Sequence, residues 1–157
     1  MPRAKRKSPE GQHDPTMGPK VKDAKVLRTL GSGTFGTCYA VVLDDDKTLC
    51  CAKLARPKAE VAEAAAELWR EATMLQLLNR AEAIPGTSHI IRLLRFVDSS
   101  RGSPFILLEL MDESLDKFLH RRGREFRGVS PTTMRSFAQQ LLTGLTFLFD
   151  HGIGEPH

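Results

Sequence analysis

The chain has 157 residues, a formal net charge of +4, 41% hydrophobic residues and 27% charged residues. This length suits one domain, and the balance of apolar and charged residues is ordinary for a soluble globular protein. No apolar run approaches the roughly 18 residues that a membrane span needs, and no signal-peptide core follows Met1. We therefore expect an intracellular protein of the cytoplasm or nucleus, without a membrane contact.

Residues 1–24 are expected to form a disordered basic tail, because four prolines stand there among polar and charged residues. The cluster at residues 3–7, Arg-Ala-Lys-Arg-Lys, fits a nuclear import signal or a weak contact with an anionic surface. A solvated tail explains the cluster at least as well.

Three glycines, Gly31, Gly33 and Gly36, stand between predicted strands at residues 25–30 and 37–43. Glycines at this spacing let a backbone turn approach phosphates closely, with successive N–H groups directed at anionic oxygens. Dinucleotide-binding folds use the same spacing, but there the loop runs from a strand into a helix. Both flanks here are short and rich in β-branched, cysteine or aromatic residues, so we place the glycines in a hairpin.

A third strand is predicted at residues 48–54, and Lys53 lies near the end of this otherwise apolar run. A charge in that place is unfavourable unless an anion meets it. A lysine at a strand edge with its head in water is the alternative. Together with the upstream glycines, Lys53 favours a clamp for phosphate groups.

The three cysteines form an odd number without metal-ligand spacing, which favours a reduced compartment. Cys50 and Cys51 are neighbours on a predicted strand, so they should face opposite ways. We expect these two and Cys38 to serve as small apolar residues, not as metal ligands or nucleophiles.

The clearest early helix is predicted at residues 59–79, which are dense in strong helix formers. Glu71 borders the apolar stripe of this helix, one turn after Glu67. Either glutamate could also be a plain solvated charge. The stripe itself recurs at helical spacing and consists of Leu68, Ala72, Leu75 and Leu78.

Two more strands are predicted at residues 90–97 and 105–108. The second strand leads into Glu109 and, two residues later, Met111. A strand that ends in this way leaves backbone N–H and C=O groups that can pair with the edge of an adenine ring. An ordinary core strand with a polar exit is the alternative.

Two helices complete the prediction, a short one at residues 114–120 and a long one at residues 131–150 with Ser130 as its N-cap. Solubility explains the basic loop at residues 121–128 better than specific nucleic-acid binding does. We therefore expect an α+β fold with a five-stranded antiparallel sheet, one large helix and two further helices.

The order of these motifs resembles the N-terminal half of a eukaryotic protein kinase over residues 26–153. The resemblance implies a small lobe with an ATP loop and hinge at residues 25–111 and a partial large lobe at residues 112–157. It implies ATP as the cofactor, a protein as the substrate or partner, and a serine/threonine or dual-specificity kinase. The residues implied to bind the nucleotide are Leu30, Gly31, Ser32, Gly33, Thr34, Phe35, Gly36, Cys38, Lys53, Glu71, Glu109 and Met111.

Individual roles follow from the same resemblance. Glu71 is implied to hold Lys53 against the α- and β-phosphates, with Glu67 as the second choice. Leu108 is implied to guard the back of the adenine pocket. Cys38 departs from the family, which usually places valine over the adenine, but a smaller apolar residue still permits binding.

A finer resemblance lies late in the chain. Residues 125–130 and 135–140 resemble the dual-specificity tyrosine-regulated kinases, whereas residues 110–118 resemble a mitogen-activated kinase kinase. We prefer the first branch.

After residues 150–153 a kinase runs into a catalytic loop with His-Arg-Asp and Asn, and a later Asp-Phe-Gly holds magnesium. Here residues 154–157 follow instead, so we expect a truncated kinase with no catalytic or metal-binding residue and negligible activity alone. A non-catalytic nucleotide- or partner-binding module and a non-functional product of a shifted reading frame are the alternatives.

The helix at residues 131–150 would then lack its packing partners. We expect it to expose an apolar stripe that promotes self-association or chaperone binding. The stripe is predicted to run through Phe137, Leu141, Leu145 and Phe149.

Overall fold

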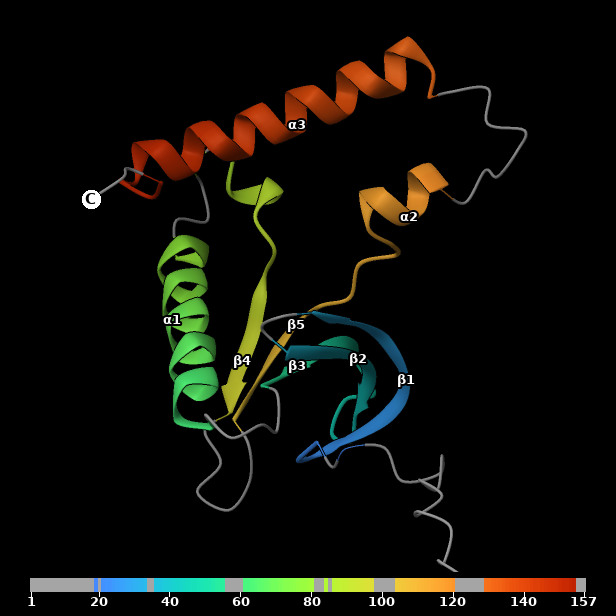
Figure 1. The fold of residues 1–157 in the computed structure, drawn as a ribbon, viewed down its shortest axis with the longest axis vertical. Helices are drawn as coiled ribbons and strands as arrows, with labels where there is room; N and C mark the ends of the chain where they lie inside the picture. The colour runs from blue at the N-terminus through green and yellow to red at the C-terminus, as the bar shows by residue number, and fades with distance from the viewer. Residues whose placement is uncertain are drawn as a thin grey trace, which may run out of the picture.

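The computed structural model describes residues 19, 21–33, 36–55, 61–80, 84, 86–97, 104–120 and 129–154. The five described strands form one antiparallel sheet in the order β1-β2-β3-β5-β4, which confirms the predicted α+β fold (Figure 1). The elements in chain order are β1 (Ala24–Gly33), β2 (Gly36–Leu43), β3 (Leu49–Leu54), α1 (Val61–Asn79), the 3₁₀ turn η1 (Thr87–His89), β4 (Leu93–Val97), β5 (Phe105–Glu109), α2 (Leu115–His120) and α3 (Pro131–Asp150).

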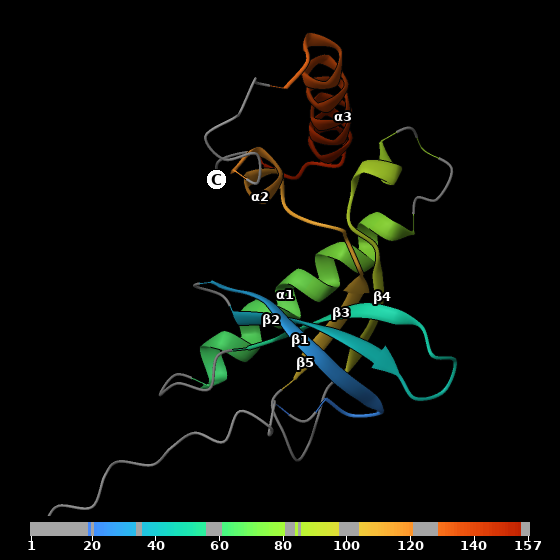
Figure 2. The same ribbon diagram turned by 90° about the vertical axis from the view of Figure 1, so that its right-hand side faces the viewer.

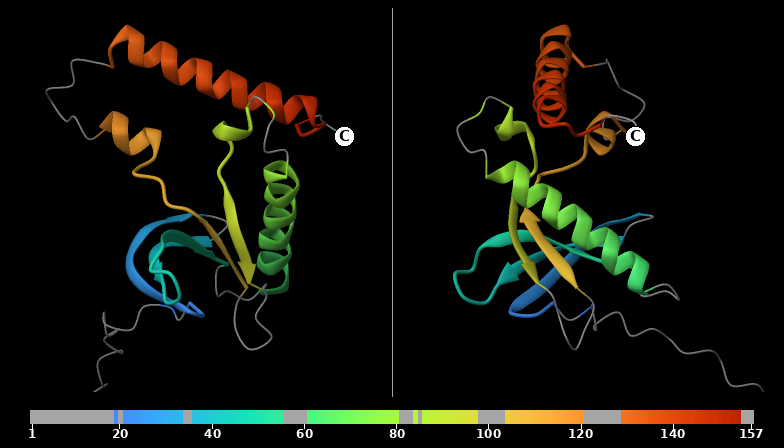
Figure 3. Two further views of the ribbon diagram at one scale, coloured as in Figure 1. Left: turned by 180° about the vertical axis from the view of Figure 1, so that it is seen from behind. Right: turned by 90° about the vertical axis from the view of Figure 1, so that its left-hand side faces the viewer.

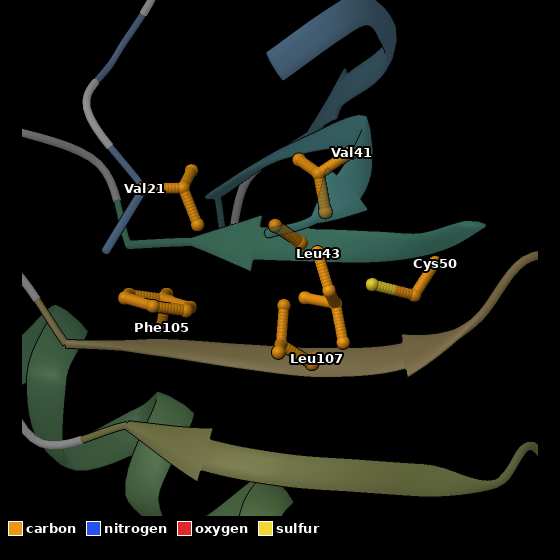
Figure 4. Packing of buried hydrophobic residues seen from close by; sticks show 7 residues of the cluster. Val21, Val41, Leu43, Cys50, Phe105 and Leu107 are labelled. Atoms are coloured by element: carbon orange, nitrogen blue, oxygen red, sulfur yellow. The ribbon is translucent and has the colours of Figure 1, made fainter. Parts of the chain in front are cut away.

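The core has two parts because the central strands are buried on both faces. Successive residues of β5 point to opposite faces, so Phe105 and Leu107 join one cluster while Ile106 and Leu108 join the other. Figure 4 shows the first cluster, which also includes Cys50 of β3. The second cluster lies on the face that α1 covers.

Val21 corrects the predicted limit of the N-terminal tail. Its side chain is only 6% exposed and belongs to the first core cluster (Figure 4). Close by, the backbone N–H of Asp44 donates a hydrogen bond to the carbonyl of Asp23 at 3.0 Å. Residues 21–24 therefore belong to the folded domain, because an apolar side chain gains more from the core than from water. Residues 1–18 and 20 lie outside the described residues.

The helix α1 lies along one face of the sheet, beside β4 (Figure 2). Its predicted stripe is confirmed, since all four of its residues are buried: Leu68, Ala72, Leu75 and Leu78. Three of them, Leu68, Ala72 and Leu75, join Ile106 and Leu108 in the second cluster. The ring of Trp69 also meets Phe96 of β4 edge-on, with centroids 5.5 Å apart. The described part of the predicted helix begins at Val61.

The strand β4 is shorter than predicted. It begins at Leu93 rather than at residue 90, because residues 87–89 form η1. The side chain of Asn79 holds the backbone between them, since its Oδ1 accepts a hydrogen bond from the N–H of Leu93 at 2.6 Å and its Nδ2 donates to the carbonyl of Ile91 at 3.4 Å. The N–H of Leu93 and the carbonyl of Ile91 therefore bond the side chain of Asn79, the last residue of α1, and do not extend the strand ladder.

The helices α2 and α3 lie together at one end of the molecule, beyond β4 and β5 (Figure 3). Both predicted starts are confirmed. The Ser114 hydroxyl accepts a hydrogen bond from the N–H of Lys117 at 3.2 Å, and the Ser130 hydroxyl accepts one from the N–H of Thr133 at 3.1 Å. Among the described helices, none is both long enough and apolar enough to cross a membrane.

α3 packs on η1, and its two buried residues are Gly144, which lies beside His89, and Phe147. Phe147 is only 2% exposed and packs against Gly86, where an added Cβ would lie 2.6 Å from the phenylalanine Cβ. The sequence pattern did not select Phe147, because several faces of α3 are apolar and the position of η1 decides which one is buried.

The predicted exposed stripe of α3 is confirmed at three positions, since Leu141, Leu145 and Phe149 are 59%, 58% and 65% exposed. The prediction is wrong for Phe137. That ring is half-buried and meets Phe118 of α2 edge-on, with centroids 5.6 Å apart. Self-association through this stripe stays a prediction.

Candidate functional site

The predicted glycine hairpin is formed by the ends of β1 and β2. In its register Gly31 lies opposite Cys38, Ser32 opposite Thr37, and Gly33 opposite Gly36. The hydroxyl groups of Ser32 and Thr37 form a hydrogen bond of 2.9 Å across the two strands. The hairpin is therefore a continuation of the sheet up to its tip. Thr34 and Phe35, the two predicted tip residues, lie outside the described residues.

The three glycines have different surroundings. Gly36 has a φ of +145°, and an added Cβ would lie 2.3 Å from the carbonyl oxygen of Leu54, so the fold itself requires glycine here. At Gly31 and Gly33 an added Cβ would meet nothing within 4 Å. Protein packing does not explain the missing side chains at these two positions. The space beside them is open for a ligand that must approach the backbone closely.

Lys53 and Glu71 form an ion pair beneath this hairpin. Lys53 lies opposite Cys38 in the β2–β3 ladder, and its Nζ is 2.5 Å from Oε2 of Glu71 on α1. The two side chains are 18% and 34% exposed, so the pair is screened from bulk water. The predicted partner is thus confirmed, and the alternative, Glu67, instead pairs with Arg70 at 3.4 Å.

An apolar wall, formed by residues in or against the second core cluster, adjoins Lys53 in the sheet. Leu108 of β5 lies opposite Cys51 of β3 and is buried. Leu30 of β1 and Cys38 of β2 are partly buried and pack against the same cluster. Four strands thus supply one apolar surface, with Lys53 following Cys51 by two residues.

At the end of β5, the backbone N–H of Glu109 is already hydrogen-bonded, unlike the free groups that the sequence predicted there. The N–H of Glu109 donates to the carbonyl of Arg92 at 3.0 Å, and Oε1 of Glu109 accepts from the N–H of Arg92 at 2.7 Å. Glu109 is therefore anchored to the segment before β4. Met111, two residues on, lies outside the ladder and is exposed. Of these two residues, Met111 is the more exposed.

Lys117 is a residue that the sequence reasoning missed. Its Nζ donates a hydrogen bond of 2.8 Å to the carbonyl of Leu30, so α2 reaches the strand that leads into the glycine hairpin. The two residues are 87 positions apart. Nothing in the sequence near Lys117 signals such a contact, since it depends on how the chain returns after β5.

Cys38 is partly buried and packs against the second cluster, which agrees with its predicted role as a small apolar residue. The pKa of its thiol is lowered from 9.0 to about 7, chiefly by a hydrogen bond with the Cys51 thiol. Burial works against this lowering of the pKa, the Lys53 ammonium adds to it, and the Glu71 carboxylate opposes it. The same hydrogen bond, together with burial, raises the pKa of Cys51. Burial raises the pKa of Cys50, which keeps the predicted apolar role.

The described residues suit the phosphates and the purine ring of ATP better than they suit a magnesium ion. The open glycines, the Lys53 ammonium and the apolar wall suit phosphates and a purine ring. Magnesium is not matched in the same way. Within the described segments, no three His, Cys, Asp or Glu side chains come together as metal ligands.

Comparison with known proteins gives one family and several relatives. A family model described as the protein kinase domain matches residues 24–154. Cell division control protein 2 homolog C of Antirrhinum majus is 28% identical over 134 residues, covering 81% of this chain and 42% of that protein. Cell division control protein 2 homolog 3 of Trypanosoma brucei brucei is 29% identical over 124 residues, covering 79% of this chain and 36% of that protein. The chain thus spans about two-fifths of the length of these curated relatives.

Proposed function

Because this chain belongs to the protein kinase domain family, we propose that it binds ATP between the glycine hairpin and the segment that follows β5. The observation that carries the proposal is the Lys53–Glu71 ion pair, whose lysine lies opposite Cys38, the residue that in turn lies opposite Gly31. In protein kinases this strand-lysine and helix-glutamate pair positions the lysine on the nucleotide phosphates.

The hydrogen-bond donors that remain on the Lys53 ammonium support phosphate binding. A lysine ammonium carries several donors, and Glu71 accepts from one of them at 2.5 Å. Phosphate oxygens would take further donors while remaining close to the backbone N–H groups of the open hairpin. Glu71 fixes the direction of the ammonium, so less side-chain entropy is lost when the ligand arrives.

The apolar wall supports a purine above it. Leu30, Cys38 and Leu108 are contributed by three different strands and pack in or against one cluster. A flat ring that rested there would bury apolar area at about 25 cal/mol per Å². Its polar edge would reach the backbone of the exposed residue Met111.

The finer activity is a second part of the proposal. For the whole protein we propose serine/threonine or dual-specificity protein kinase activity in the cytoplasm or nucleus, on a protein substrate. Phosphoryl transfer needs a positioned base and metal ions. The printed sequence has no Asp-Phe-Gly, so we propose that these 157 residues bind ATP without transferring its γ-phosphoryl group. A radiolabel transfer assay on a generic protein substrate would contradict this if the chain alone were active.

The kinase branch is also a proposal. The motifs at residues 125–130 and 135–140 support the dual-specificity tyrosine-regulated kinases. The two relatives described above carry names of cell division control protein 2 homologues. Substrate profiling of the whole protein separates these branches: phosphorylation of tyrosine as well as serine or threonine peptides would favour the dual-specificity branch.

A calorimetric titration with ATP tests the nucleotide proposal. We predict saturable binding by the native chain and at least roughly tenfold weaker binding by Lys53→Met, since one charge-assisted hydrogen bond contributes about 1.5–3 kcal/mol. Lys25→Met is the matched control, because Lys25 is exposed on β1. Equal affinities for the native chain and Lys53→Met, with both folded by circular dichroism, would contradict the proposal.

A second candidate is a module that binds another protein through α3. The exposed side chains of Leu141, Leu145 and Phe149 favour it. Of the possible occupants we propose a second copy of this chain, and the test is given in the Discussion with the other properties of α3.

A further inference from the structure

The hydrogen bond between Lys117 and Leu30 joins two parts of the chain that the sheet does not join. The Nζ of Lys117, on α2, donates to the carbonyl oxygen of Leu30, on β1, at 2.8 Å. Leu30 directly precedes Gly31, the first glycine of the hairpin. The bonded residues are 87 positions apart, so local sequence does not produce this contact. The contact ties the start of the hairpin to α2.

The β1–β2 ladder is irregular at the point where this bond is made. Thr29 of β1 lies opposite Tyr39 of β2. The next partner on β2, Cys38, lies opposite Gly31 instead of Leu30. Leu30 is therefore an extra residue on β1, as in a β-bulge, which disrupts the ladder locally and bends the strand. Such a place allows a strand carbonyl to accept from a side chain outside the sheet.

The two bonded residues are anchored on their own sides. The backbone N–H of Lys117 donates to the Ser114 hydroxyl at 3.2 Å, so the lysine lies in the capped first turn of α2. The next residue, Phe118, meets Phe137 of α3 edge-on, with ring centroids 5.6 Å apart. On the other side, Leu30 packs its side chain against the second core cluster. The bond thus connects two held segments.

This bond spans one border of the candidate nucleotide site. The glycine hairpin forms one side of that site, and the segment after β5, with Met111, forms the other. α2 begins at Leu115, soon after Met111. A bond from α2 to Leu30 therefore connects the two sides. Because Lys117 is exposed, water competes for its ammonium, and the bond can open and close readily.

We propose that Lys117 is a latch on the glycine hairpin. Its bond to the Leu30 carbonyl limits the motion of the hairpin and slows the release of a nucleotide held between the hairpin and the segment after β5. Lys117 acts through the Leu30 carbonyl, which makes it a positioning residue. The effect on release rests on the proposed ATP function, whereas the effect on the hairpin rests only on the hydrogen bond.

Hydrogen–deuterium exchange of the native 157-residue chain without ligand tests the hold on the hairpin. Lys117→Met keeps an aliphatic side chain but removes its donors. We expect it to speed exchange in peptides covering Gly31–Cys38 at least roughly threefold, the scale of one weak hydrogen bond, and to leave α1 unchanged. Lys117→Arg keeps a charged donor and should retain the native rate. Lys25→Met, at an exposed position of β1, is the matched control.

Stopped-flow release of ATP and of adenosine tests the effect on the nucleotide. A latch retains both ligands, so Lys117→Met should speed the release of each by a similar factor, at least roughly threefold. Adenosine carries no phosphate, so the comparison separates a latch from a direct contact between the ammonium and the phosphates.

Unchanged exchange in a Lys117→Met chain that is folded by circular dichroism would overturn the proposal. Faster release of ATP with unchanged release of adenosine would also overturn it, because Lys117 would then bind phosphate directly. Faster exchange in the hairpin of a Lys117→Met chain, when no variant binds either ligand, would support the hold on the hairpin and count against the proposed ATP function.

Discussion

Single residues decide what the hairpin does. Gly31, Gly33 and Gly36 form one motif in the sequence, yet only Gly36 has a left-handed-type φ and a backbone carbonyl in the place of a side chain. The other two glycines are open. Gly36 therefore serves the fold, whereas Gly31 and Gly33 are free to serve a ligand.

This difference gives a stability prediction. Gly36→Ala should lower the free energy of unfolding by about 1–3 kcal/mol, because alanine would be strained at that φ and would crowd the Leu54 carbonyl. Gly33→Ala is the matched control and should change it by no more than about 0.5 kcal/mol. Urea unfolding followed by Trp69 fluorescence measures both. Equal stability of the two variants would show that the conformation at Gly36 is not required.

The residue scale is also where sequence reasoning succeeded and failed most clearly. The Lys53–Glu71 pair was predictable, because a charge near the end of an apolar strand and a charge beside a helical stripe are both local signals. The lowered pKa of the Cys38 thiol was not. It depends on a diagonal neighbour, Cys51, whose position follows from the strand register and not from composition.

At the scale of elements, α3 has a divided surface. Phe147 and Gly144 pack on η1, while Leu141, Leu145 and Phe149 face solvent. Each of these three side chains would gain about 1.5–3 kcal/mol on full burial, which favours a partner that covers them.

We predict that the chain self-associates through this face. Sedimentation velocity should show a mass above the monomer that rises with concentration, and Leu141→Glu with Leu145→Glu should restore the monomer. Thr132→Glu with Gln139→Glu adds the same charge at exposed polar positions of α3 and should leave association intact. A native chain that stays monomeric at every concentration would refute this prediction.

The start of β4 and the buried face of α3 were not predicted, because both depend on contacts between distant elements. Helix starts at Ser114 and Ser130 were legible, since capping is a local interaction. The start of β4 was not, because the amide of Asn79 reaches across from α1 to the backbone of Leu93. The buried face of α3 likewise depends on where η1 lies.

At the scale of the molecule, the site gathers parts from distant stretches of one chain. The hairpin comes from β1 and β2, the ammonium from β3, its partner from α1, and the exposed residue Met111 from the segment after β5 (Figure 1). Lys117 of α2 then donates a hydrogen bond to the carbonyl of Leu30, which links α2 to β1. The order of the motifs predicted this assembly, but no sequence pattern predicted the contact between α2 and β1.

The central claim is that this assembly binds ATP at one place, and hydrogen–deuterium exchange with and without ATP tests it most directly. We predict slower exchange in peptides that cover Gly31–Cys38 and Glu109–Met111, no change in α3, and loss of the effect in Lys53→Met. Slower exchange confined to other segments, or none in a folded chain at saturating ATP, would contradict the account.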